Sequence, residues 1–220
     1  MINSPPDDHV NDNGSLKQAA HTISILLHPL FMPVLALWTA MQLDPHLSYF
    51  LPAQAQWFTL GMVTMMGVVF PLSCMLLLRR AGLITSLEMP HRQERIAPFV
   101  MTLIYYGMTY YLLRQTRLDG TVLSLFSGAM LALLFTTFIT MRWKISVHLV
   151  GIGGLAGTIA GIAELHSMPM LFWLACSILL AGLLGTARLL TGSHVPAQVY
   201  AGGVLGFACT YACIALGLSF

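Results

Sequence analysis

Seven long apolar segments constrain the fold of this chain more than any other feature of its sequence. A bilayer core about 30 Å thick needs roughly 20 mostly apolar residues for one helical crossing. Apart from Arg114 at the end of the third, none of the segments contains Asp, Glu, Lys or Arg; they cover residues 23–43, 57–78, 98–114, 121–141, 147–163, 170–187 and 199–218. Only 8% of the 220 residues are charged and 57% are hydrophobic, so a soluble fold would lack polar cover. We therefore predict an all-α, polytopic transmembrane helical bundle of about six or seven spans.

The apolar segments are continuous, which favours helices, because the strands of membrane barrels show short stretches of alternating hydrophobicity. The third and fifth segments are short for a full crossing, so tilted or partly interfacial helices are expected there. Residues 1–20 are expected to form a polar, mobile tail, and residues 21–220 a single transmembrane domain. Pro29 and Pro33 predict a kinked or broken start to the first span. The expected location is a bacterial cell (inner) membrane.

Small residues recur at intervals of four in two of the predicted spans. Gly153, Gly157 and Gly161 share one face of the fifth span, and Gly202 and Gly206 share one face of the seventh. Such spacing lets transmembrane backbones approach closely. We therefore expect these two spans to pack tightly.

The basic residues gather on one side of the predicted bundle. With seven spans, the N-terminal tail and the loops after the second, fourth and sixth spans lie together. That side carries eight of the ten Lys and Arg residues, namely Lys17, Arg79, Arg80, Arg92, Arg95, Arg142, Lys144 and Arg188. The positive-inside rule would make this side cytoplasmic, whereas a site for an anionic headgroup would gather the same residues in either compartment. The sequence leaves both explanations open.

Two histidines lie on the same side of the predicted bundle. His148 opens the fifth span, and His194 precedes the seventh, with Gln198 one helical turn beyond it. A lone histidine at a membrane interface is more often structural than catalytic. Two of them, brought together with arginines through separate loops, form a candidate site.

The segment Ala187–Gly202, with the sequence ARLLTGSHVPAQVYAG, resembles the third signature of the type 2 phosphatidic acid phosphatase superfamily, which comprises membrane lipid phosphatases and haloperoxidase-like enzymes. That signature reads Ser-Arg, five residues, His, three residues, Asp, usually followed by Val-x-Ala-Gly. The spacing from Arg188 through His194 to position 198 fits, as does the Val-x-Ala-Gly. Gln198 stands where the signature has Asp.

Two further segments resemble the other signatures of this superfamily. Ile145–His148 keeps the Ser and His of Pro-Ser-Gly-His, and Arg92–Pro98 loosely resembles Lys, six residues and Arg-Pro. All three segments follow even-numbered spans and so share one side. The likeness covers about residues 90–206, which would form the phosphatase-like core.

The resemblance implies a function and a role for each matching residue. His194 would attack phosphorus to give a phosphohistidine, oriented by Gln198, and His148 would protonate the leaving oxygen. Arg188 would stabilise the developing charge, while the implied substrate-binding residues are Arg92, Arg95, Lys144 and Ser146. Neither a metal nor a cofactor is implied.

The implied protein is a membrane-embedded phosphatase acting on a lipid phosphate or pyrophosphate, with membrane lipids around it and no nucleic-acid partner. A second hypothesis is that the chain binds or scaffolds an anionic lipid without turnover. Gln198 keeps this hypothesis open, because a neutral amide cannot stabilise an imidazolium as Asp does. A small transporter is a third hypothesis, for which a polar cavity near the bilayer midplane and paired intramembrane charges would be expected.

Overall fold

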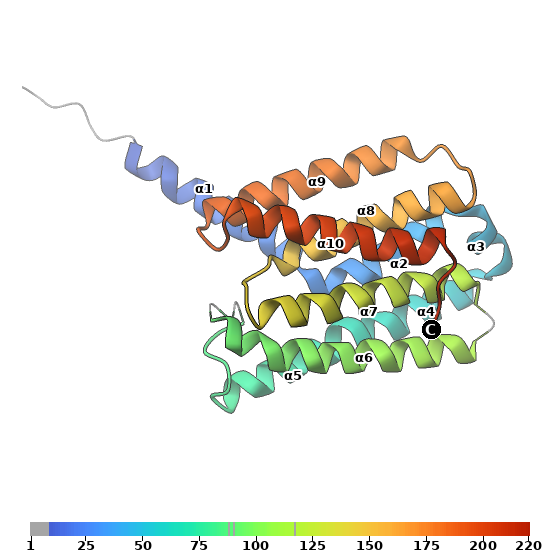
Figure 1. Cartoon of the computed structure of the whole chain (residues 1–220), viewed down its shortest axis with the longest axis horizontal. Helices are drawn as coiled ribbons and strands as arrows, with labels where there is room; N and C mark the ends of the chain where they lie inside the picture. Colours follow the sequence, from blue (N-terminus) through green and yellow to red (C-terminus); the bar gives the residue numbers. More distant parts are fainter. Residues whose placement is uncertain (1–8, 88, 90, 117) are drawn as a thin grey trace, which may run out of the picture.

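The computed structural model describes residues 9–87, 89, 91–116 and 118–220, and over these residues the chain is helical with no β-strand (Figure 1). The all-α prediction is confirmed. The elements are α1 (His9–Leu26), the 3₁₀ turn η1 (Pro29–Phe31), α2 (Met32–Leu43), α3 (Pro45–Phe50), α4 (Ala53–Thr64), the π-helical η2 (Met65–Val69), α5 (Phe70–Arg80), the 3₁₀ turn η3 (Arg92–Arg95), α6 (Ile96–Gln115), α7 (Gly120–Thr140), α8 (Val147–Leu165), α9 (Leu171–Leu190) and α10 (Pro196–Ala215).

Seven helical segments within the described residues are long and apolar enough to cross a membrane: Gly14–Leu43, Ala53–Arg80, Arg92–Gln115, Gly120–Thr140, Val147–Leu165, Leu171–Leu190 and Pro196–Ala215. The chain is an integral, multi-pass membrane protein, as predicted. The third segment has 24 residues and the fifth has 19, so both are longer than the sequence indicated. The sixth extends to Leu190, which places Arg188 inside the last turn of α9 instead of beyond it.

The start of the chain differs from the sequence-based expectation. Residues 9–20, which were expected to belong to a polar, mobile tail, are helical and belong to α1, while residues 1–8 lie outside the described part. The expected break in the first span is present: α1 ends at Leu26, Pro29 opens η1, and Pro33 lies in the first turn of α2. Pro29 and Pro33 have no N–H to donate, so a helix running through them would lose hydrogen bonds. His28 therefore lies at an interruption, where its side chain caps η1.

Helices α8 and α10 lie side by side and form the most extensive helix pair in the bundle (Figure 1). A methyl group added at Gly153 would overlap the Gly203 carbonyl, and one added at Gly206 would overlap the Val150 carbonyl. Where α10 contacts α7, a Cβ at Gly128 of α7 would lie 2.6 Å from the Thr210 Cα. The glycine spacing therefore predicted the packing of these two spans correctly.

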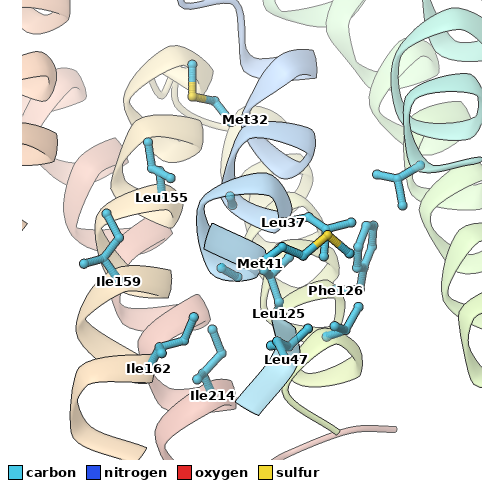
Figure 2. Packing of buried hydrophobic residues seen from close by; sticks show 14 of the residues in the cluster. Met32, Leu37, Met41, Leu47, Leu125, Phe126, Leu155, Ile159, Ile162 and Ile214 are labelled. Atoms are coloured by element: carbon cyan, nitrogen blue, oxygen red, sulfur yellow. The ribbon is translucent and has the colours of Figure 1, made fainter. Parts of the chain in front are cut away.

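Buried apolar side chains from α2, α3, α4, α6, α7, α8, α9 and α10 form the main core, part of which Figure 2 shows from close by. Leu37 and Phe126 are fully buried there, as are Ile162 and Ile214. In a membrane, lipid tails are as apolar as these side chains, so close packing is what favours this arrangement over separated helices. The core fixes α2 against α7 and α8.

The loops after α5, α7 and α9 meet at one end of the bundle, from which α1 also projects (Figure 1). This end, called the basic end below, carries the connection 81–91, the connection 141–146 and the connection 191–195. The three segments that resemble the superfamily signatures lie there. The fold thus brings them together as the sequence predicted.

Candidate functional site

A cavity of about 550 Å³ lies inside the bundle and reaches the basic end. Side chains from both halves of the chain line it, and most of them are apolar. The histidines and arginines in the lining are His21, His28, Arg95, His148, Arg188 and His194. Of the four residues predicted to be catalytic, His148, His194 and Arg188 thus line one cavity, and Gln198 contacts one of them.

His194 and Gln198 form a hydrogen-bonded pair at the start of α10. Nδ1 of His194 lies 2.9 Å from Oε1 of Gln198, which also accepts the backbone N–H of Val195 at 3.3 Å. Because a backbone N–H can only donate, the atom facing Val195 is the amide oxygen. Nδ1 of His194 must then carry the proton that it donates to this oxygen. The lone pair of neutral His194 is left on Nε2.

The surroundings keep His194 neutral. The pKa of His194 is lowered from 6.5 to about 4, mainly by burial and further by the positive charges of Arg188, Arg95 and Lys144, while the hydrogen bond to Gln198 acts in the opposite direction. The side chain is 7% exposed. At neutral pH this imidazole is therefore an uncharged base with a free lone pair, which is the state that a nucleophile requires.

Arg95, Lys144 and Arg188 bring three positive charges to the basic end. Burial lowers the pKa of Lys144, and the charges of Arg95 and Arg188 lower it further. Arg95 is 6% exposed, and its Nε donates to the carbonyl oxygen of Met89 at 2.9 Å. Met89 has a φ of 45°, a region uncommon for a long side chain, so this loop conformation holds the guanidinium in place at a conformational cost. A multiply charged anion would relieve the mutual repulsion of the three cations.

His148 lies in the first turn of α8 and contacts the first span. Its Nε2 lies 3.2 Å from the carbonyl oxygen of Ser24 in α1. A carbonyl only accepts, so Nε2 carries a proton, and the lone pair of neutral His148 is on Nδ1. The ring of His28 meets this imidazole edge to face, with centroids 5.5 Å apart. In neutral His148, only Nδ1 is therefore left to accept a proton.

Three of the predicted substrate-binding residues lie outside the cavity lining. Nη1 of Arg92 donates to the carbonyl oxygen of Arg142 at 2.6 Å and so ties η3 to the connection 141–146. Ser146 is fully buried, and its N–H donates to the Gln198 carbonyl at 3.2 Å, which joins the start of α8 to the start of α10. Lys144 contributes charge without lining the cavity. Arg95 alone of this group lines it.

Sequence reasoning assigned no motif to the first span, yet His21, Ser24 and His28 line the cavity. The sequence carried a signal for this contribution, because His28 directly precedes the helix-breaking Pro29. A chain turns inward at such a break. Among the described residues, no group of three His, Cys, Asp or Glu side chains is placed to hold a metal ion.

No family model, no curated protein and no solved structure matches this chain.

Proposed function

We propose that this protein is a membrane-embedded phosphatase that hydrolyses a lipid phosphate or pyrophosphate through a phosphohistidine intermediate. The observation that carries the proposal is the tautomer of His194: the bond to Gln198 leaves the Nε2 lone pair available in a cavity that Arg95 and Arg188 also line. The signature resemblance supports the same reading. The apolar remainder of the cavity suits the hydrocarbon part of a lipid.

In the first step, Nε2 of His194 attacks phosphorus, and the bond from phosphorus to the leaving oxygen breaks. As the anionic headgroup binds, His148 takes up a second proton on Nδ1; it gives this proton to the leaving oxygen and keeps its Nε2–H on the Ser24 carbonyl. Arg95 and Arg188 stabilise the negative charge on the other phosphate oxygens. The products are the lipid alcohol and phosphorylated His194.

In the second step, water attacks the phosphorylated imidazole. Neutral His148 now accepts a proton from this water at Nδ1, which restores its starting state. Phosphate leaves, and Nε2 of His194 regains its lone pair. The proton balance closes over the two steps.

Three of the ionisable groups in the cavity lie at or next to the ends of spans. His148 lies in the first turn of α8, Arg188 in the last turn of α9, and His194 between α9 and α10. This arrangement favours a headgroup site at the membrane surface over a transport pathway through the midplane. A bacterial cell (inner) membrane stays the proposed location.

A specific observation supports a second candidate, a lipid-binding protein without turnover. Attack by Nε2 leaves a positive charge on the imidazole of His194, and Gln198 offers it a neutral oxygen where a carboxylate would offer a full negative charge. In serine proteases, the equivalent change from Asp to Asn lowers turnover by about 10⁴. Binding of the anion by Arg95 and Arg188 does not need that charge.

Phosphate release from a panel of lipid phosphates and pyrophosphates by purified protein in detergent separates the two candidates. The phosphatase proposal expects release that His194→Gln abolishes, together with a phosphohistidine trapped in the wild type by acid-free quenching. Binding of the same lipids with no release by wild type, and release only after Gln198→Asp, would establish the binding protein instead.

A further inference from the structure

A groove of about 420 Å³ lies on the outer surface of the bundle, between α2 and α4. Its lining is apolar except for Thr64, and Leu26 and Trp57 in that lining are largely exposed. Every lining residue belongs to the first or the second membrane-crossing segment, Gly14–Leu43 or Ala53–Arg80. The groove therefore opens toward the hydrocarbon of the bilayer, and hydrocarbon chains surround it.

The groove and the cavity share two lining residues, Phe31 and Met32. Phe31 is the last residue of η1 and Met32 is the first of α2, so both follow directly on the break in the first span at Pro29. Because the same two side chains line the space inside the bundle and the groove outside it, the wall between the two spaces is one side chain thick here. The cavity is thus closest to the bilayer at the break in the first span.

The two residues of this wall differ in how firmly they are held. Met32 is 2% exposed, and a Cβ added at Gly151 of α8 would lie 2.7 Å from its Cγ and 3.3 Å from the Cα of Pro29. The backbone of the break is therefore packed tightly on α8. Phe31 is 45% exposed, and its ring meets that of His28 edge to face, with centroids 6.3 Å apart. A half-exposed ring can change rotamer quickly, whereas Met32 can move only if α8 moves, so Phe31 is the movable part of the wall.

The groove runs from the basic side of the membrane toward the other side. The start of α2 packs on Gly151 in the first turns of α8, and just past its end Oδ2 of Asp44 lies 3.2 Å from Nε2 of His166, which follows α8. Helix α2 therefore leads away from the basic end, and Trp38 in the groove lies about 10 Å further along than Phe31 at a rise of 1.5 Å per residue. A lipid of the leaflet on the basic side has the same direction, with its headgroup at the basic end and its chain pointing along the groove.

We propose that an anionic lipid enters the cavity sideways from the bilayer, between the first two spans, with its hydrocarbon chain in the groove and Phe31 as the gate. Lipid tails are as apolar as the groove, so the chain gains no hydrophobic free energy there and can slide along it. The ring of Phe31 turns aside when the chain crosses the wall, and the cations of the basic end receive the headgroup. The inference rests on the proposed function for turnover but not for entry and binding, since a lipid that is bound without hydrolysis uses the same entrance.

The first test compares phosphate release from hexadecyl phosphate in vesicles and from hexyl phosphate in solution, with the protein reconstituted in the same vesicles. The long chain has to cross the wall from the bilayer, whereas hexyl phosphate reaches the basic end from water. Phe31→Trp, which enlarges the gate, should lower kcat/KM for hexadecyl phosphate by about tenfold, the scale of one misfitting group in an apolar pocket, and leave hexyl phosphate unaffected. Phe31→Ala, which removes the ring, should not lower it. Phe58→Trp is the matched control, because Phe58 is exposed on α4 and belongs to neither lining.

The second test needs no turnover. Hexadecyl phosphate with bromine atoms on its chain, at a low mole fraction in the vesicles, should quench the fluorescence of Trp38 and Trp57, because both indoles line the groove. Trp38→Phe and Trp57→Phe together should remove most of this quenching. In that double variant, Phe31→Trp should restore it, since the new indole stands in the path of the chain, and Phe58→Trp should not.

Two results would overturn the inference. One is an equal loss of kcat/KM for both phosphates in Phe31→Trp, and the other is quenching that Phe58→Trp restores as well as Phe31→Trp does. If neither phosphate is released but the quenching follows Trp38, Trp57 and Phe31→Trp, the entrance stands and the phosphatase proposal fails.

Discussion

Nδ1 of His194 and Oε1 of Gln198 lie 2.9 Å apart, and the same amide oxygen accepts the N–H of Val195. The backbone donor fixes which end of the amide faces the imidazole, and the amide fixes which ring nitrogen carries the proton. A neutral residue thus does one of the two tasks of a carboxylate, since it orients the ring without stabilising a positive charge on it. The chemistry available to His194 follows from this pair.

Gln198→Asp should raise phosphate release by at least about tenfold. The carboxylate would still accept from Nδ1 and would also stabilise the imidazolium, so the pKa of His194 should rise. Gln198→Leu, which keeps the volume and removes the acceptor, should lower release. The measurement is kcat with one lipid phosphate for the three proteins at equal folded concentration. Equal rates in all three would mean that this pair does not take part in turnover.

His194 should stay unprotonated well below neutral pH. Its pKa of about 4 in the folded protein compares with 6.5 for an ordinary histidine. The unfolded chain therefore takes up a proton at His194 as the pH falls through 6.5, whereas the folded protein does so only near pH 4. The free energy of unfolding therefore decreases as the pH falls from 6.5 to 4. Diethylpyrocarbonate modifies neutral imidazole, and its reaction at His194, followed by peptide mass spectrometry, should titrate near pH 4 in the native protein and near 6.5 in the denatured one. Coincident titrations would contradict this account of the site.

Arg95→Gln should weaken the binding of anions at the basic end. Arg95 is buried in the cavity wall, so its charge acts on a bound anion with little screening by water. Loss of this charge-assisted contact should raise the inhibition constant of orthovanadate, an anion that resembles phosphate, by about tenfold or more. Arg114→Gln is the control, because Arg114 is exposed in the last turn of α6, at the other end of the bundle. If both substitutions raised the inhibition constant equally, the overall charge of the protein, and not Arg95 itself, would be the cause of the weaker binding.

Gly206→Ala should destabilise the bundle by about 1–3 kcal/mol, because the new methyl group overlaps the Val150 carbonyl between α8 and α10 and the backbones must move apart. Gly182→Ala in α9 is the matched control: nothing lies within 4 Å of the added methyl, and alanine favours a helix over glycine. Thermal unfolding in detergent should show a lower Tm for the first variant and an unchanged or higher Tm for the second. A Gly206→Ala protein as stable as wild type would mean that α8 and α10 are not so closely packed.

The sequence by itself determined the seven apolar spans, the break at Pro29 and the close packing of the glycine faces. It also placed His148, His194 and Arg188 on one side of the bundle. These features depend on local composition and on spacing along a helix, which a single sequence carries directly. In a bilayer these features decide the fold class, because a backbone in hydrocarbon must satisfy its hydrogen bonds within helices.

Only the tertiary structure decided which helices meet at the cavity. It brought Ser24 and His28 of the first span against His148, and it used Arg92 and Ser146 in backbone contacts outside the cavity lining. It also left the hydroxyl of Thr136 without the local bond that Thr137 makes. Contacts of this kind join residues far apart in the chain and depend on how closely two backbones approach. Periodicity within one helix carries no information about that distance.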